Sequence, residues 1–207
     1  MAREFRNLVH AVIETGEGKT WDQWVDEMDK RAREILPDGS IIFHFWHERF
    51  SEIAPMVVQV LQNSSGASVE IRGGVRIAGR NVRAKADRVW DGVVMDIKTG
   101  AAPNKKQLTD GNMPQLPLEA YMLQTGGFSI PTTAKSQTPV MQVLQLQNNN
   151  VKLIEYDTAT TQAMIDGSIE KITQLFGIYS NDYQSYEYYE TSDPKYKAYD
   201  DLARVDD

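Results

Sequence analysis

Residues 86–100, Ala-Asp-Arg-Val-Trp-Asp-Gly-Val-Val-Met-Asp-Ile-Lys-Thr-Gly, constrain the fold more than any other stretch. Asp91-Gly92 predicts a tight hairpin turn, because glycine tolerates the positive φ that such turns require. The apolar and β-branched residues after the turn predict a second strand. That strand also carries Asp96 and Lys98, which leave it on one face because they are two residues apart. The hairpin therefore predicts a sheet with polar groups gathered at the end of one strand.

The first strand of the hairpin contributes Asp87, which the turn can bring beside Asp96 and Lys98. Two carboxylates are hard oxygen ligands that suit Mg²⁺ or Mn²⁺. An adjacent lysine can hold an attacking water or stabilise negative charge on phosphorus. Asp87 followed by Asp96-Ile97-Lys98 also resembles the pattern of the PD-(D/E)xK nucleases. The alternative is an exposed strand edge whose charges protect against aggregation, and the hairpin alone does not decide between the two.

The chain has 207 residues, enough for one large domain or two small ones, and no cysteine. The lack of cysteine excludes a disulfide framework, a cysteine-ligated zinc site and an iron–sulfur cluster. No stretch is long and apolar enough for a transmembrane helix, and no signal peptide heads the chain. We therefore expect no membrane association.

The net charge of −7 conceals a local basic segment. Residues 71–106 hold nine basic residues against three acidic ones, which favours a phosphate-binding surface around the hairpin. The basic residues are Arg72, Arg76, Arg80, Arg83, Lys85, Arg88, Lys98, Lys105 and Lys106. A solvated strand face with alternating charge is the alternative reading. Among them, Arg88, Lys105 and Lys106 are our candidates for binding DNA.

Periodicity predicts helices, then strands, then one helix, two strands and a last helix. The expected helices are 2–14, 21–36, 41–62, 114–124 and 159–179. The expected strands are 67–77, 80–89, the second strand of the central hairpin, 139–147 and 151–156. Residues 101–114 are predicted to be a polar loop. We expect one α/β domain with a mixed central sheet, preceded by a helical part.

Several local features carry their own expectations. Gly16 to Thr20 imitates a phosphate-binding loop, but Ile13 stands where that motif needs a glycine, and a helix precedes it instead of a strand. Thr20 is instead expected to cap the next helix, with Gln23 completing a capping box. In that helix Trp21 and Ile35 are expected to point inward.

Two expected interruptions of regular structure and one pair of histidines complete the local predictions. Pro55 is expected to kink or split its helix. Gly73-Gly74 is expected to form a turn or bulge. His44 and His47 are spaced like a metal pair, but no carboxylate motif accompanies them, so packing or surface roles are favoured.

Further segments resemble the nucleases of the RecB and AddB type. Residues 5–14, Phe-Arg-Asn-Leu-Val-His-Ala-Val-Ile-Glu, resemble the histidine helix of that family. Residues 114–120, Pro-Gln-Leu-Pro-Leu-Glu-Ala, resemble the glutamine helix of AddB proteins, and residues 199–205 resemble their C-termini. The resemblance spans almost the whole chain and implies a fold like that of the restriction endonucleases.

The resemblance also implies roles for individual residues. His10, Asp87, Asp96 and the carbonyl of Ile97 are expected to bind Mg²⁺ or Mn²⁺. Asp87, Asp96, Lys98 and Gln115 form the expected catalytic set, in which Gln115 contacts DNA or orders the site. Glu119 stands where many relatives have a tyrosine, and Tyr121 is displaced from that position. This departure leaves the role of the tyrosine open.

The implied activity is a metal-dependent deoxyribonuclease, an exonuclease, in double-strand break repair. It is expected to act on single strands or duplex ends of DNA with an AddA-type helicase-nuclease subunit in the bacterial cytoplasm. AddB proteins are much longer, so the chain is expected to be an excised C-terminal domain or a stand-alone relative. The alternatives are nuclease chemistry in CRISPR adaptation or phage DNA processing, and a non-catalytic DNA-binding or scaffold domain.

The expected organisation is a single nuclease domain over residues 1–207. Residues 1–62 are its helical part with the metal-binding histidine, and residues 63–180 are its nuclease core. Residues 181–207 form a tail with eight acidic residues against three basic ones, and most of the tyrosines of the chain lie near it.

Overall fold

The computed structural model describes residues 2–180, apart from residues 17, 38, 65, 131–136 and 148. The predicted tail at 181–207 therefore lies outside the described residues. The helices are α1 (Ala2–Glu14), α2 (Trp21–Ile35), α3 (Ile41–Leu61), the short 3₁₀ helix η1 (Gln62–Ser64), α4 (Lys105–Thr109), α5 (Gln115–Thr125) and α6 (Thr158–Ile178). The strands are β1 (Ser68–Ile77), β2 (Arg80–Trp90), β3 (Val93–Lys98), β4 (Val140–Gln147) and β5 (Asn150–Tyr156).

The strands form one five-stranded sheet in the order β1-β2-β3-β4-β5. β3 and β4 are parallel, whereas the other neighbours are antiparallel. A parallel pair needs a long crossover, and here α4 and α5 lie in the segment that joins β3 to β4. The predicted α/β fold with a mixed central sheet is confirmed.

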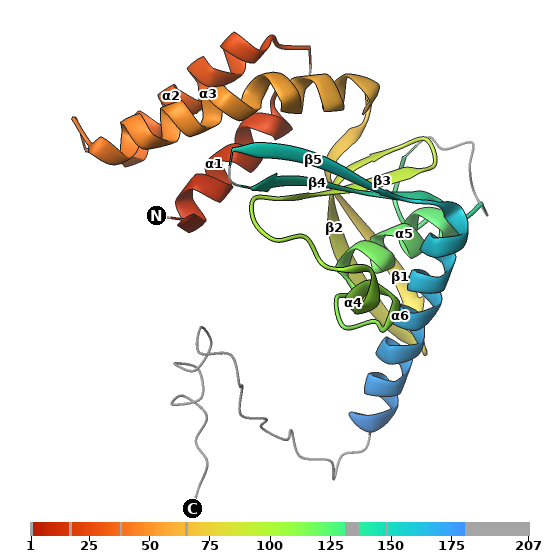
Figure 1. The fold of residues 1–207 in the computed structure, drawn as a ribbon. Helices are drawn as coiled ribbons and strands as arrows, with labels where there is room; N and C mark the ends of the chain where they lie inside the picture. Colours follow the sequence, from red (N-terminus) through yellow and green to blue (C-terminus); the bar gives the residue numbers. More distant parts are fainter. Residues whose placement is uncertain are drawn as a thin grey trace, which may run out of the picture.

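Helices cover both faces of the sheet (Figure 1). The first core lies between α1–α3 and the sheet face that bears Met95, Ile97 and Leu144. The second core lies between the opposite face, with Val94 and Val143, and helices α5 and α6. Adjacent residues of β3 thus enter different cores, as the alternation of side chains along a strand requires.

The local turn and cap chemistry follows the sequence closely. Gly92 has a φ of 73° in the turn between β2 and β3. Thr20 caps α2 and forms the predicted capping box with Gln23. Trp24 and Met28 are buried in the first core. The predicted hairpin and the predicted helix start are therefore both confirmed.

Trp21 and Ile35 were expected to point inward, and this prediction was wrong. Their exposed fractions are 45% and 53%. They are the first and last residues of α2 and lie outside its run of buried residues from Trp24 to Ala32.

Three other local predictions are corrected. α3 runs without interruption through Pro55, so the proline does not split it; Pro55 lies on an exposed side of the helix. Gly73 and Gly74 lie within β1 and form no turn there. The predicted loop at 101–114 contains helix α4, because Asn104 caps it through a capping box that the sequence analysis overlooked.

Candidate active site

The site lies where strands β2 and β3 separate. The two strands pair only from Arg88–Trp90 to Val93–Met95. Asp87 is the next residue of β2, and its carboxylate Oδ2 accepts a hydrogen bond of 2.7 Å from the backbone N–H of Ile97. The Asp87 carboxylate thus accepts the hydrogen bond that a backbone carbonyl of β2 would accept if the two strands stayed paired. This contact brings Asp87 beside β3 beyond their shared ladder.

β3 continues past this point along β4 and presents Asp96 and Lys98. Lys98 Nζ donates to Asp96 Oδ1 at 2.9 Å. Gln115 Nε2, at the start of α5, donates to the same oxygen at 3.2 Å. Lys98 Nζ also lies 3.5 Å from Gln115 Oε1. The structure therefore brings together Asp96, Lys98 and Gln115, three of the four residues of the predicted catalytic set, with Asp87 beside them.

His10 reaches the site from α1. Its Nδ1 lies 4.0 Å from Asp87 Oδ2, and both side chains are partly exposed. Val9 and Ile13 anchor α1 in the first core, which leaves His10 on the side of the helix that faces the strands. The predicted neighbourhood of His10 and Asp87 is present in the structure.

These side chains share an open cleft of about 670 Å³. It is lined by Arg6, His10, Asp87, Asp96, Ile97, Lys98, Thr99, Gly100, Ala101 and Gln115. The cleft is large enough for a small ligand or a segment of a polymer. Every residue of the predicted metal set contributes to its lining.

Glu70 on β1 is a site residue that the sequence analysis missed. One ligand atom each of His10, Glu70 and Asp87 lies within 4.8 Å of the others, so the three could hold a cation. Glu70 has a φ of 53°, which is uncommon for a residue other than glycine, and its carboxylate pairs with Lys85. No motif marks it, because its proximity to Asp87 arises from the β1–β2 register.

Glu119 is the second residue that was missed as part of the site. It is fully buried on α5, and its Oε1 accepts a hydrogen bond of 3.2 Å from Gln115 Nε2. Its Oε2 has no hydrogen-bond partner among the described residues. Burial, with the nearby Asp96 carboxylate, raises the pKa of Glu119 to about 8. Gln115 therefore bridges two carboxyl groups.

Asp96 is 2% exposed, and burial raises its pKa, with the Asp87 carboxylate adding to the rise. The Lys98 ammonium opposes this by stabilising the ionised form. Two ionised carboxylates side by side, Asp96 and Asp87, would repel each other, so their arrangement favours a cation in the cleft.

The structure places the predicted DNA-binding residues in three different surroundings. Gln115 lines the cleft. Lys105 and Lys106 are exposed on α4; Lys106 pairs with Asp110, and Lys105 Nζ lies 3.5 Å from Thr160 Oγ1. Arg88 is only 2% exposed, with a long hydrogen bond to the carbonyl of Ser64. Its burial argues against the direct phosphate contact that we predicted, because β2 turns its side chain toward the first core.

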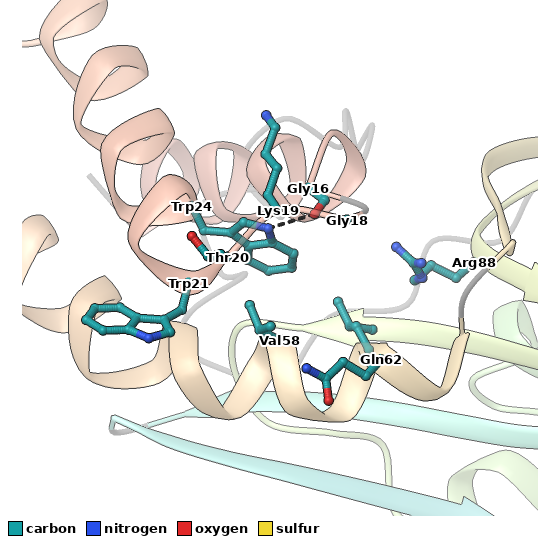
Figure 2. Close-up of a pocket in the computed structure, with 10 residues that line it drawn as sticks. Gly16, Gly18, Lys19, Thr20, Trp21, Trp24, Val58, Gln62 and Arg88 are labelled. Carbon is teal, nitrogen blue, oxygen red and sulfur yellow. Dashed lines mark hydrogen bonds between the residues drawn. The ribbon is translucent and has the colours of Figure 1, made fainter.

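A second cavity, of about 480 Å³, lies beside the loop at 16–20 (Figure 2). Trp24 Nε1 donates a 2.8 Å hydrogen bond to the carbonyl of Gly16. A Cβ at Gly16 would collide with the Trp24 indole. The glycine thus accommodates a tryptophan, which agrees with our rejection of a phosphate-binding loop.

Among the described residues, no helix is long and apolar enough to cross a membrane. His47 Nδ1 lies 2.8 Å from Asp29 Oδ1, so it has the surface role that we favoured over a metal pair with His44.

Comparison with known proteins decides the family. The family model of the PD-(D/E)XK nuclease superfamily matches residues 2–197. The chain belongs to this superfamily. The PD-(D/E)XK assignment agrees with the strand pair that carries Asp87, Asp96 and Lys98.

Two curated relatives extend this comparison. The chain is 26% identical over 172 residues to an uncharacterized protein of Rickettsia typhi, covering 72% of the chain and 20% of that protein. It is 27% identical over 150 residues to an uncharacterized protein of Rickettsia bellii, covering 61% of the chain and 18% of that protein. The chain therefore spans about a fifth of the length of these relatives.

Among solved structures, the chain resembles a candidate exonuclease from Eubacterium rectale. The TM-score is 0.51 at 11% identity, and the alignment covers 81% of this chain and 66% of that chain. At this identity the likeness supports the overall fold alone.

Proposed function

We propose that this chain is a divalent-metal-dependent deoxyribonuclease that hydrolyses phosphodiester bonds in the cleft at Asp87, Asp96 and Lys98. The observation that carries the proposal is the separation of β2 and β3, which places two carboxylates, a lysine and a glutamine around one open space. Superfamily membership supports the same chemistry. We further infer that residues 1–207 act as one nuclease domain.

The donor atoms fit Mg²⁺ or Mn²⁺. Asp87, Asp96 and the carbonyl of Ile97 offer hard oxygen ligands, and His10 adds one nitrogen, which Mn²⁺ accepts readily. Glu70 offers a further carboxylate near His10 and Asp87. A bound ion would neutralise charge on the phosphate and lower the pKa of an attacking water. The adjacent carboxylates of Asp87 and Asp96 favour such a partner, since Lys98 supplies a single positive charge.

The protein side chains divide the remaining work. Hydrolysis adds water across a P–O bond: the water loses a proton as its oxygen bonds to phosphorus, and the leaving 3′-oxygen gains one. Lys98, held by Asp96 and Gln115, can donate hydrogen bonds to the water or to the phosphate oxygens. Gln115 fixes the Asp96 carboxylate through Nε2, so it positions the site.

A cleavage assay tests the proposal directly. Linear DNA is incubated with the protein in Mg²⁺, in Mn²⁺ or in chelator, alongside Asp96→Asn and Lys98→Ala. We expect metal-dependent cleavage that falls at least ~10²-fold in each variant, because each loses charge stabilisation or water activation. Lys152→Ala on β5 is the matched control, because Lys152 is exposed and lies outside the cleft. Cleavage that survives in both site variants would exclude the assignment.

The finer biological setting is part of the same proposal. Resemblance to the RecB and AddB nucleases supports an exonuclease that processes double-strand breaks, together with an AddA-type helicase-nuclease. An exonuclease degrades linear DNA and leaves covalently closed circles intact. Cutting of closed circles would place the activity among endonucleases and favour the CRISPR or phage setting.

A further inference from the structure

Strands β1 and β2 form a two-stranded ribbon with very different faces. Alternate residues of a strand share a face, and the register places Arg72 opposite Lys85 and Gly74 opposite Arg83. Arg76 follows on the same face of β1. Arg72, Arg76, Arg83 and Lys85 therefore lie together, and we name them the basic ribbon face. All four residues are exposed.

The opposite face of the ribbon is apolar and covered. Ile71, Val75, Val82 and Ala84 pack against the second core, which also contains residues of α5 and α6. The four cations therefore point away from the helices that cover the ribbon, and the helices hold the ribbon in place from behind.

Structural roles account for only some of these charges: Lys85 pairs with Glu70, and Arg76 donates a 2.9 Å hydrogen bond to the carbonyl of Gly79. Cations on strand edges protect against aggregation, and this role is open to both strands of the ribbon, because β1 is an edge strand and β2 pairs with β3 only from Arg88 onward. Like charges opposite each other, as at Arg72 and Lys85, disfavour folding. Within the described part of the chain, no carboxylate forms an ion pair with Arg72 or Arg83.

The basic ribbon face runs directly into the catalytic cleft. Lys85 pairs with Glu70, whose carboxylate lies near that of Asp87, so the basic ribbon face meets the acidic cluster of the cleft at Lys85. Alternate residues of a strand are about 6.7 Å apart, so the cations form a row that begins next to Asp87. Gly74 leaves the middle of this row without a side chain. Nothing in the packing requires a glycine there, because a Cβ would meet only the carbonyl of Val82, at 3.6 Å.

We propose that the basic ribbon face binds the sugar–phosphate backbone of the DNA strand beyond the scissile phosphate. The proposal rests on the proposed function, which places the scissile phosphate at Asp87. The strand then passes along the ribbon from Lys85 toward Arg76, with its backbone close to Gly74. Contacts of this kind are to phosphate groups, so they secure the substrate without reading its sequence.

The test compares two double variants that remove equal charge. Arg72→Gln with Arg83→Gln alters the ribbon, and Lys30→Gln with Lys152→Gln alters exposed positions on α2 and β5. Affinity for duplex DNA is measured by fluorescence anisotropy in Ca²⁺, which we expect to allow binding with little cleavage, from ~50 to ~300 mM salt. Each lost contact should reduce the log–log salt slope by roughly 0.9 and the affinity at ~0.1 M salt by up to about 8-fold. The ribbon variant should therefore lose up to ~60-fold, and the control should stay within ~2-fold.

A second pair of variants probes the middle of the row. Gly74→Glu should weaken binding by placing a carboxylate among the cations, whereas Gly74→Ala should leave affinity unchanged. Thermal melts check that all variants fold; loss of like-charge repulsion predicts an unchanged or higher Tm for the ribbon variant.

The outcomes separate this inference from the proposed function. An unchanged slope in the ribbon variant, or equal losses in ribbon and control variants, would overturn the inference even if the protein cleaves DNA. Specific loss of binding in the ribbon variant, with no cleavage by the native protein in any metal, would uphold the binding surface and reject the nuclease. A native protein that does not bind DNA would overturn both.

Discussion

Glu119 is a buried acid that the sequence did not reveal, because the resemblance pointed to a tyrosine at its position. Its side chain is fully buried one turn after Gln115, and burial raises its pKa from the ordinary 4.5 to about 8. The protonated form of Glu119 suits this buried position, since its O–H can donate a hydrogen bond, whereas an ionised carboxylate can only accept one. Glu119 therefore supports Gln115, which in turn holds Asp96.

This burial predicts a pH-dependent stability. The folded-state pKa exceeds the unfolded one, so folding takes up a proton between pH 4.5 and about 8. The corresponding stability is complete below pH 4.5 and is lost as the pH rises through 8. Relative to Glu119→Gln, the native protein should lose roughly 3 kcal/mol between pH 5 and pH 8, at ~1.4 kcal/mol per pH unit. Urea unfolding in chelator at several pH values measures this difference, and parallel curves for the two proteins would contradict it.

His10 carries a prediction about metal affinity. His10→Ala should weaken Mn²⁺ binding and leave the Tm nearly unchanged, because its side chain is partly exposed and its nearest charged partner is Asp87. Glu70→Gln should weaken binding as well, since Glu70 lies in the same cluster. Calorimetric titration with thermal melts measures both properties, and His44→Ala, at an exposed position on α3, is the control. A lower Tm with native Mn²⁺ affinity would make His10 a packing residue.

Strand β1 carries two adjacent glycines, Gly73 and Gly74, that differ in how much space surrounds them. Gly73 forms an isolated bridge with Phe128, and a Cβ on it would lie 2.5 Å from the Phe128 ring. Gly74 donates its N–H to the carbonyl of Gly127 but has room for a methyl group. The segment at Gly127 and Phe128 thus covers part of the outer edge of β1, which limits further pairing there.

These environments predict that the same substitution affects stability at Gly73 but hardly at Gly74. Gly73→Ala should destabilise the protein by about 1–3 kcal/mol, because Phe128 would have to move out of the second core. Gly74→Ala should change stability by less than about 0.5 kcal/mol, as is usual for exposed positions. Chemical denaturation of both variants measures the contrast, and equal effects would show that the Phe128 contact is not what requires Gly73.

In the molecule as a whole, each of the two cores holds a different helix of the site. α1, which carries His10, belongs to the first core, whereas α5, which carries Gln115, belongs to the second. Asp87 lies on β2, and Asp96 and Lys98 lie on β3. Both strands belong to the sheet that runs between the two groups of helices (Figure 1). The site is therefore assembled from both faces of the sheet, and only the folded molecule brings its parts together.

A pair of core variants tests this arrangement. Val9→Ala and Met164→Ala each remove a fully buried side chain, from the first and second core respectively, and should cost about 1–3 and 2–5 kcal/mol. Measured at a temperature where both variants are folded, Val9→Ala should weaken Mn²⁺ binding, because it loosens the helix that holds His10. Met164→Ala on α6 should leave that affinity unchanged. Equal affinities in the two variants would show that α1 packing does not position His10.

Local sequence patterns determined much of this protein. Asp91-Gly92 predicted the turn between β2 and β3, and the spacing of two between Asp96 and Lys98 put them on one face, because these features depend on backbone geometry within a few residues. The Thr20 capping box was predicted for the same reason, and Gln115 and His10 were marked by resemblance. Their roles in binding metal and in catalysis remain predictions.

Tertiary structure decided the features that depend on residues far apart in the chain. The separation of β2 from β3, the proximity of Glu70 to Asp87 and the burial of Glu119 and Arg88 leave no local pattern in the sequence. The exposure of Trp21 likewise depends on how α2 packs against the rest of the molecule. The sequence places charges along strands; strand register and helix packing decide which of them meet in the cleft, which are buried and which stay exposed.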